Sequence, residues 1–232
     1  MRNLTLMVNR LVFWDIDGTL MHCGSDGRKA LNRTFYELYG IMDAFRMADV
    51  GSSMDFMLIS GIMATFGIDQ KDLSSIIKHY HEVLIEILEE NNTKQVLPGV
   101  VSVLDAIDKH PHSINALLTS NLRIGAEAKL NSVGLYSYFN LGGFGDDPGE
   151  KWDAANRCIS YAEKQYNTFF PREQIYLIGD STYDIYSAQK MGIRSISVAT
   201  GWVDHETLVS CNPDYFFPDL SNTNQVLEAL NI

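Results

Sequence analysis

The segment formed by residues 11–19 constrains the fold of this chain more than any other. It begins with four consecutive apolar residues, Leu-Val-Phe-Trp, and runs directly into Asp15. A strand with one face in solvent alternates polar and apolar residues, so this run predicts a strand that is buried on both faces, as in a parallel sheet. Ligands of open parallel sheets bind beyond the carboxyl ends of the strands. We therefore expect Asp15 and Asp17 to lie in a ligand site at that end.

The pair Asp15 and Asp17 would bring two negative charges into a small volume, which favours a bound cation. Carboxylate oxygens suit Mg²⁺, which binds one or two carboxylates and keeps its other positions for waters and phosphate oxygens. Gly18 allows a sharp turn and a close backbone approach to a bound anion. The same residues also suit a simple turn after a strand, because Asp and Gly are common turn residues.

The rest of the chain divides into a helical part and a part in which strands and helices alternate. Between residues 24 and 95, apolar spacings of three and four predict three helices, which end near Gly40, Phe66 and Glu90. After Leu97, apolar runs predict strands at residues 114–119, 174–179, 195–198 and 215–217. This order predicts an α/β fold in which one parallel sheet with crossover helices is interrupted by a helical insert.

The composition excludes several classes of partner. A formal net charge of −11 disfavours binding to nucleic acid or to an anionic membrane, both of which call for clustered Lys and Arg. No apolar run reaches the length of a membrane span, and residues 1–10 show no export signal. The three cysteines are far apart and lack metal-ligand spacing, which predicts reduced thiols in a cytoplasmic protein. A monomer and a homodimer are both compatible with the sequence.

Polar residues follow two further predicted strands. Thr119 ends the predicted strand at residues 114–119, and Ser120 and Asn121 follow it; their hydroxyl, amide and backbone N–H groups suit phosphate oxygens. Asp180 ends the next long strand, and Asp184 lies one helical turn beyond it. Both groups also suit a simpler function as helix caps.

The fourth polar feature is Lys151, at the end of a turn-rich loop and just before a predicted helix over residues 152–166. A single lysine in such a place is usually a solvated charge. These four motifs, in their order along the chain, nevertheless resemble those of the haloacid dehalogenase superfamily. Residues 142–147, Gly-Gly-Phe-Gly-Asp-Asp, and the spacing from Asp180 to Asp184 resemble its phosphoglycolate-phosphatase-like subgroup.

The resemblance covers almost the whole chain and implies both a fold and an activity. The implied fold is a Rossmann-like three-layer α/β core, formed by residues 1–24 and 97–232, with an α-helical cap domain at residues 25–96. The implied enzyme is a Mg²⁺-dependent phosphatase that acts on a small phosphorylated metabolite through an aspartyl-phosphate on Asp15. Asp17 would protonate the leaving oxygen and then activate water.

Each remaining site residue has an implied role. Mg²⁺ would be bound by Asp15, by Asp180 and by the backbone carbonyl of Asp17, with Asp184 orienting a bound water or supporting Lys151. Charge on the transferring phosphoryl group would be dispersed by Lys151, Thr119 and loop N–H groups. The residues expected to contact phosphate are Asp17, Gly18, Thr119, Ser120, Asn121 and Lys151.

Other functions of the same superfamily remain open. A haloacid dehalogenase lacks the second aspartate that Asp17 supplies, and a phosphosugar mutase carries a cap histidine where this chain has Gly27. A non-catalytic binding protein would have lost one of the four motifs. Substrate choice is expected to lie in the cap, where residues 51–53 lack the Arg that relatives often carry, so Arg28 or Arg46 would have to replace it.

Overall fold

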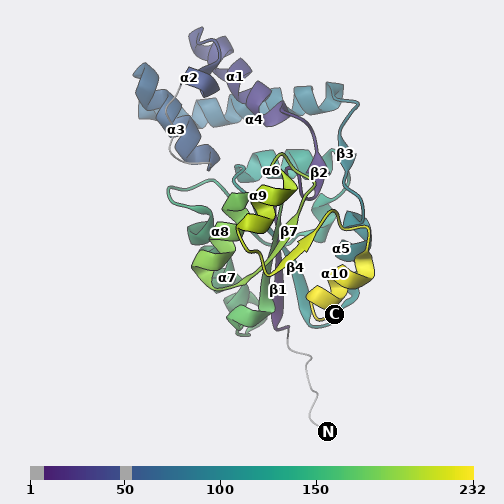
Figure 1. Cartoon of the computed structure of the whole chain (residues 1–232). Coiled ribbons are helices and arrows are strands. Elements are labelled where there is room, and N and C mark those ends of the chain that lie inside the picture. Colours follow the sequence, from purple (N-terminus) through teal and green to yellow (C-terminus); the bar gives the residue numbers. More distant parts are fainter. Residues whose placement is uncertain (1–7, 48–53) are drawn as a thin grey trace.

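A parallel sheet of six strands organises the molecule, in the order β5-β4-β1-β6-β7-β8 (Figure 1). The computed structural model describes residues 8–47 and 54–232. The strands are β1 (Arg10–Trp14), β4 (Ser113–Leu118), β5 (Gly142–Gly143), β6 (Ile175–Gly179), β7 (Arg194–Val198) and β8 (Tyr215–Phe217). The predicted α/β class is therefore confirmed, and the predicted strands agree with β4, β6, β7 and β8 to within one residue.

Helices cover both faces of the sheet, as the apolar run in β1 predicted. Val12 and Trp14 pack with apolar residues of α5 (Val100–Lys109), α6 (Arg123–Asn131) and α10 (Thr223–Ala229). Leu11 and Phe13 point to the opposite face, where α7 (Lys151–Tyr166) and α8 (Thr182–Met191) pack. All four side chains are fully buried. The shorter helices are η2 (Tyr136–Tyr138), η3 (Arg172–Gln174) and α9 (His205–Ser210).

The inserted segment lies at the carboxyl end of β1, above the sheet in Figure 1. Its helices are α1 (Asp26–Tyr39), α2 (Ala44–Met47), α3 (Asp55–Phe66), η1 (Gln70–Asp72) and α4 (Leu73–Glu90). The chain passes into and out of this segment through two short strands that pair antiparallel, β2 (Met21–His22) and β3 (Gln95–Val96). The two crossings are therefore held side by side, close to the predicted boundaries at residues 24 and 97.

The helix ends of the insert follow the glycine signals. Gly40 and Gly67 adopt the left-handed conformation directly after α1 and α3, as expected of C-terminal glycines. The segment 51–53, which the sequence analysis described as lacking an Arg, lies outside the described residues. The helix α2 and the strands β2 and β3 were not predicted, because segments of two to four residues carry no readable periodicity.

No helix within residues 8–47 and 54–232 has both the length and the apolar character needed to cross a bilayer.

The return from the insert depends on Gly99, which has a φ of +78° and precedes α5. A Cβ atom at this position would lie 1.9 Å from the backbone oxygen of Leu220. Gly134 has a similar φ of +74°, but a Cβ atom there would meet nothing within 4 Å.

We predict that Gly134→Ala lowers the free energy of unfolding by about 1 kcal/mol, the strain of a positive φ. Gly99→Ala should lower it by at least about 2 kcal/mol more, because the backbone around Leu220 must move. Urea unfolding of both variants measures the difference. Equal losses would contradict the assigned clash.

Candidate active site

The two acids at the strand ends lie side by side because β1 and β6 are neighbours. Trp14 is in register with Ile178, and the N–H of Asp15 donates to the backbone oxygen of Ile178 at 3.0 Å. Asp15 and Asp180 therefore leave the sheet at almost the same level. Asp184, in the first turn of α8, completes a group of three carboxylates whose oxygens lie within 4.8 Å of one another.

Lys151 neutralises part of this cluster from the first residue of α7. Its ammonium donates to Asp15 at 2.8 Å and to Asp184 at 2.5 Å, and it is almost fully buried. The second oxygen of Asp184 accepts from the N–H of Ser181, closing a capping box at the start of α8. Both helix starts are thus built so that their polar groups meet at the strand ends, as the sequence predicted for Lys151.

The cluster carries more negative charge than one lysine balances. Burial raises the pKa of Asp15 to about 6, an effect that Lys151 opposes and Asp184 reinforces. Burial, together with the charges of Asp15 and Asp184, raises the pKa of Asp180 to about 8. A divalent cation would relieve this repulsion, and three carboxylates suit a hard ion such as Mg²⁺. These residues therefore fit the predicted metal.

Gly18 supports the cluster by leaving space. It has a φ of +88°, and a Cβ atom on it would lie 2.4 Å from a carboxylate oxygen of Asp180. Its N–H donates to the backbone oxygen of Met21 at 2.9 Å. The missing side chain of Gly18 therefore leaves room for Asp180, and the predicted contact of Gly18 with phosphate stays a prediction. The neighbouring Thr19 hydroxyl donates to Asp180 at 2.9 Å.

The carboxylate of Asp17 is held apart from the cluster by three donors. One oxygen accepts from Lys129 Nζ at 2.6 Å and from Asn121 Nδ2 at 2.8 Å, and the other from Cys23 Sγ at 3.4 Å. Burial alone would raise the pKa of Asp17, but the charge of Lys129 and the hydrogen bonds from Lys129, Asn121 and Cys23 together outweigh it, and the pKa is lower than usual. The predicted metal contact through the backbone carbonyl of Asp17 stays a prediction.

Lys129 is the residue that sequence reasoning missed. It is 4% exposed and lies on α6 with its ammonium between Asp17 and the Asn121 side-chain oxygen, 2.7 Å away. A signal existed, since Lys129 follows Ala126 and Gly125 at spacings of three and four and so lies on the buried face of α6. A lysine in such a position is rarely buried without a charged partner.

The loop after β4 differs in part from the prediction. Asn121 donates to Asp17 and, at 2.7 Å, to Thr119 Oγ1. Both N–H groups of its amide are thus in use, and the side chain positions Asp17; its predicted contact with phosphate stays a prediction. Thr119 is fully buried beside it. Ser120 lines a cavity between the core and the insert.

This cavity, which we call the chamber, has a volume of about 460 Å³. Its floor is polar, and α1 to α4 supply the apolar walls. Of the two arginines proposed as substrate contacts, Arg28 lines the chamber and Arg46 does not. The lining residues are Asp17, Gly24, Ser25, Gly27, Arg28, Leu31, Phe45, Asp55, Leu58, Ile59, Tyr80, Ser120, Asn121, Lys129 and Trp202.

The amino-terminus of α3 fastens the insert to the core. The N–H groups of Asp55 and Phe56 donate at 2.9 Å to the backbone oxygens of Ser120 and Gly145. The Asp55 carboxylate accepts from the N–H of Leu122 at 3.1 Å. Three hydrogen bonds therefore close the chamber on the side of the β4 loop.

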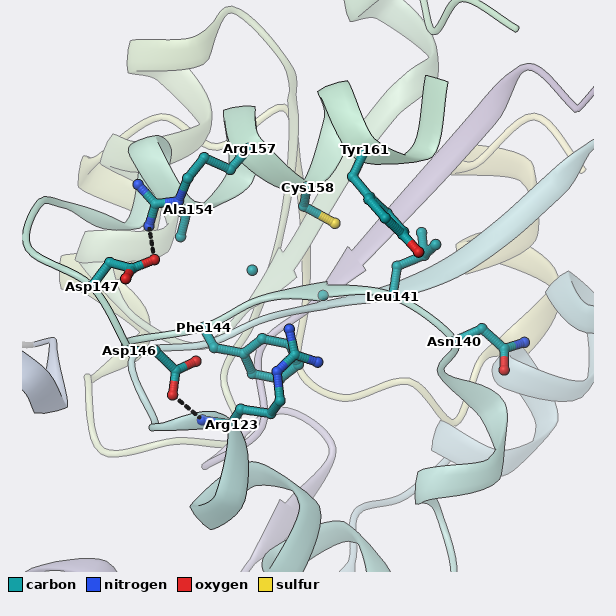
Figure 2. A pocket seen from close by; sticks show the side chains of 12 residues that line it. Arg123, Asn140, Leu141, Phe144, Asp146, Asp147, Ala154, Arg157, Cys158 and Tyr161 are labelled. Carbon is teal, nitrogen blue, oxygen red and sulfur yellow. Dashed lines mark hydrogen bonds and ion pairs between the residues drawn. The ribbon is translucent and has the colours of Figure 1, made fainter. Parts of the chain in front are cut away.

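Figure 2 shows a second cavity of about 410 Å³, between β5, the start of α6 and the outer face of α7. Its charged groups already have partners. Arg157 pairs with Asp147 at 3.5 Å, and the Arg123 guanidinium lies 4.0 Å from the centre of the Phe144 ring. Asp17 and Lys129 line the chamber, whereas neither residue lines this second cavity. The chamber is therefore the better candidate for a substrate site.

Comparison with known proteins identifies the relatives of this arrangement. Residues 12–198 match the family model described as haloacid dehalogenase-like hydrolase. A phosphoglycolate phosphatase of Agrobacterium fabrum is 24% identical and covers 91% of this chain and 89% of its own. A 5'-nucleotidase of Pseudomonas aeruginosa is 23% identical over 99% of this chain and 100% of its own. The crystal structure of CbbY from Rhodobacter sphaeroides in complex with phosphate has a TM-score of 0.67 at 19% identity, covering 92% and 95% of the two chains.

The Asp55 contact predicts a pH dependence of stability. Burial raises the pKa of Asp55 to about 6, so the folded state binds a proton more tightly than the unfolded state does. Stability is therefore lost as the pH rises through that pKa. Asp55→Asn keeps an oxygen for the Leu122 N–H but cannot titrate.

As the pH rises from about 5 to about 7.5, the unfolding free energy of the variant should increase by about 1 kcal/mol relative to that of the wild type. Urea unfolding at both pH values measures this difference, and Asp108→Asn, at an exposed position of α5, is the control. A wild-type-to-variant difference that does not change with pH would contradict the prediction.

Proposed function

The chain belongs to the haloacid dehalogenase-like hydrolases, and from this premise we propose that it hydrolyses a small phosphate monoester at Asp15. One observation carries the proposal: Asp15 stands at a strand end beside a buried lysine and two further carboxylates. Its relatives are named for different substrates, phosphoglycolate and 5'-nucleotides. Their names therefore support the phosphatase class and leave the substrate open.

Asp15 is the proposed nucleophile. Its carboxylate would attack phosphorus, the ester bond to the alcohol oxygen would break, and water would then release phosphate from the aspartyl-phosphate. Lys151 contacts the Asp15 carboxylate and would hold it in one orientation while dispersing charge on the transferring oxygens. Asp184 fixes the lysine from the other side.

Asp17 is the proposed acid and base. It would give a proton to the leaving alcohol oxygen and take one from the attacking water. Lys129, Asn121 and Cys23 hold its carboxylate in place, and its side chain is 37% exposed, which leaves it accessible from the chamber. A second acid held in this way favours phosphoryl transfer over dehalogenation. Haloacid dehalogenases, as the resemblance implies, lack this second aspartate.

Mg²⁺ is the proposed cofactor, which would be held by the carboxylates of Asp15 and Asp180 and by the backbone carbonyl of Asp17, with Asp184 supporting Lys151. When bound, the ion supplies positive charge that offsets repulsion between the nucleophile and the phosphate. The hydroxyl of Thr119 and the N–H of Ser120 would contact the phosphate oxygens directly.

The insert is the proposed cap domain, with residues 25–96 closing over a core formed by residues 1–24 and 97–232. Closure would exclude water from the attack on phosphorus, and opening would release the product.

Burial raises the pKa of Cys23 and of Cys158 to about 12. Such unreactive thiols are compatible with the cytoplasm as the compartment in which the enzyme acts.

We predict that Asp15→Asn lowers the turnover of phosphate monoesters by more than about a thousandfold, because an amide cannot attack phosphorus. Stability should stay the same or rise, since one of three crowded carboxylates is removed. Steady-state kinetics and thermal unfolding measure the two effects. In the wild type, a beryllium fluoride adduct located by crystallography should lie on Asp15, and an adduct on another side chain would refute the assignment.

Removal of the metal gives an independent prediction. Turnover should fall to background in excess EDTA and return on addition of Mg²⁺, because three carboxylates and one lysine leave the site short of positive charge. Mg²⁺ should also raise the unfolding temperature of the wild type by binding the folded state alone. Asp180→Asn should lose this shift. Full activity after thorough chelation would rule out the metal.

A further inference from the structure

Trp202 combines wide exposure with a place in the lining of the chamber. It lies in the loop between β7 and α9, and 77% of its surface is accessible. The same chamber has Asp17 and Ser120 in its lining. An indole ring therefore borders the space that leads to the proposed reacting groups.

The loop that carries Trp202 is fastened to the catalytic cluster by its two preceding residues. The Thr200 hydroxyl donates to the backbone oxygen of Gly18 at 2.6 Å. Gly201 packs so closely on Asp180 that a Cβ atom would lie 1.6 Å from its carboxylate oxygen. The His22 ring, from β2, lies 5.8 Å from the indole. The backbone that carries Trp202 is thus held in place close to Asp180.

The opposite wall of the chamber is apolar. Leu31, Phe45, Leu58 and Ile59 come from α1, α2 and α3 and line it together with Arg28. The Arg28 guanidinium lies 4.3 Å from the centre of the Phe45 ring. The N–H donors of the Arg28 guanidinium therefore lie over the face of the Phe45 ring. A space of about 460 Å³ far exceeds the needs of a two-carbon alcohol and lies in the range of sites for larger ligands.

From these contacts we propose that Trp202 is a specificity-determining residue that stacks on a planar aromatic ring of the leaving group. The substrates would be phosphate monoesters of ring-bearing alcohols. The phosphate would bind at Asp15 and the ring would lie between Trp202 and the apolar wall. Water and the ester give the free alcohol and inorganic phosphate. This inference rests on the proposed phosphatase function and adds the class of substrate to it.

The physical reason is the large contact area of an indole. Stacking of a ring on an aromatic side chain contributes roughly tenfold in affinity or more. Trp202 loses little freedom on binding, because Thr200 and Gly201 already hold its backbone. An aliphatic leaving group of the same length would gain much less from the same surface.

The test compares esters with and without a planar ring. Uridine 5'-monophosphate, adenosine 5'-monophosphate and pyridoxal 5'-phosphate are the ring-bearing probes, and ribose 5-phosphate and glycerol 3-phosphate lack a planar ring. With Mg²⁺ present, we expect kcat/KM for at least one ring-bearing probe to exceed both ring-free values at least tenfold. Trp202→Ala should lower that value about tenfold, mainly through KM, and change the ring-free values less than twofold.

Two further variants separate recognition from structure. Trp202→Phe should restore most of the preference for the ring, and Phe169→Ala, at a residue that is 71% exposed and outside the chamber, should leave all five values unchanged. Equal losses for ring-bearing and ring-free probes in Trp202→Ala would overturn the proposal. So would a wild-type enzyme that treats both groups alike.

A binding measurement keeps this inference distinct from the catalytic proposal. Calorimetry measures the affinity of the Asp15→Asn variant for the preferred ring-bearing probe, or for all three if none is hydrolysed. Adding Trp202→Ala should weaken the affinity about tenfold. If no probe is hydrolysed but Trp202→Ala still weakens binding, the phosphatase proposal is refuted and the role of Trp202 in binding stands. Undiminished binding without the indole would refute the role of Trp202.

Discussion

The arrangement of the site depends on a buried ammonium that contacts two of three clustered carboxylates. Lys151 contacts Asp15 and Asp184, while Asp180 stays close to both without a lysine of its own. In a medium of low dielectric constant such a group is strongly favoured only when its charges balance. The imbalance would favour a further cation at the strand ends, as proposed for Mg²⁺.

A second lysine gives Asp17 an environment different from that of Asp15. Lys129 pairs with Asp17 from α6, whereas Lys151 pairs with Asp15 from α7 on the other face of the sheet. Opposite charges lower the pKa of Asp17, while burial raises that of Asp15. Two carboxylates separated by one residue therefore have different environments and different proton affinities.

The sequence predicted those features that depend on one strand and the residue after it. Apolar runs ending in Asp15, Thr119 and Asp180 were sufficient to place these residues at one edge of the sheet. Lys129 and Trp202 were missed because their importance arises from tertiary contacts. A lysine within a helix and an aromatic residue in a loop have the same local pattern whether they contact an active site or solvent. The contacts of Asn121 and Gly18 were also not predicted. Asn121 binds Asp17, which is distant in sequence, and Gly18 forms a backbone hydrogen bond that no motif encodes.

The loop after β7 shows how specificity can change without loss of the catalytic centre. Gly201 and Thr200 are constrained by Asp180 and by the Gly18 carbonyl, so neither position tolerates much change. The next side chain, Trp202, is 77% exposed, lines the chamber and lies 5.8 Å from the His22 ring. A substitution there alters the surface offered to the leaving group and leaves the carboxylates where they are. The centre and the part that selects the substrate are therefore adjacent in sequence but separate in their physical constraints.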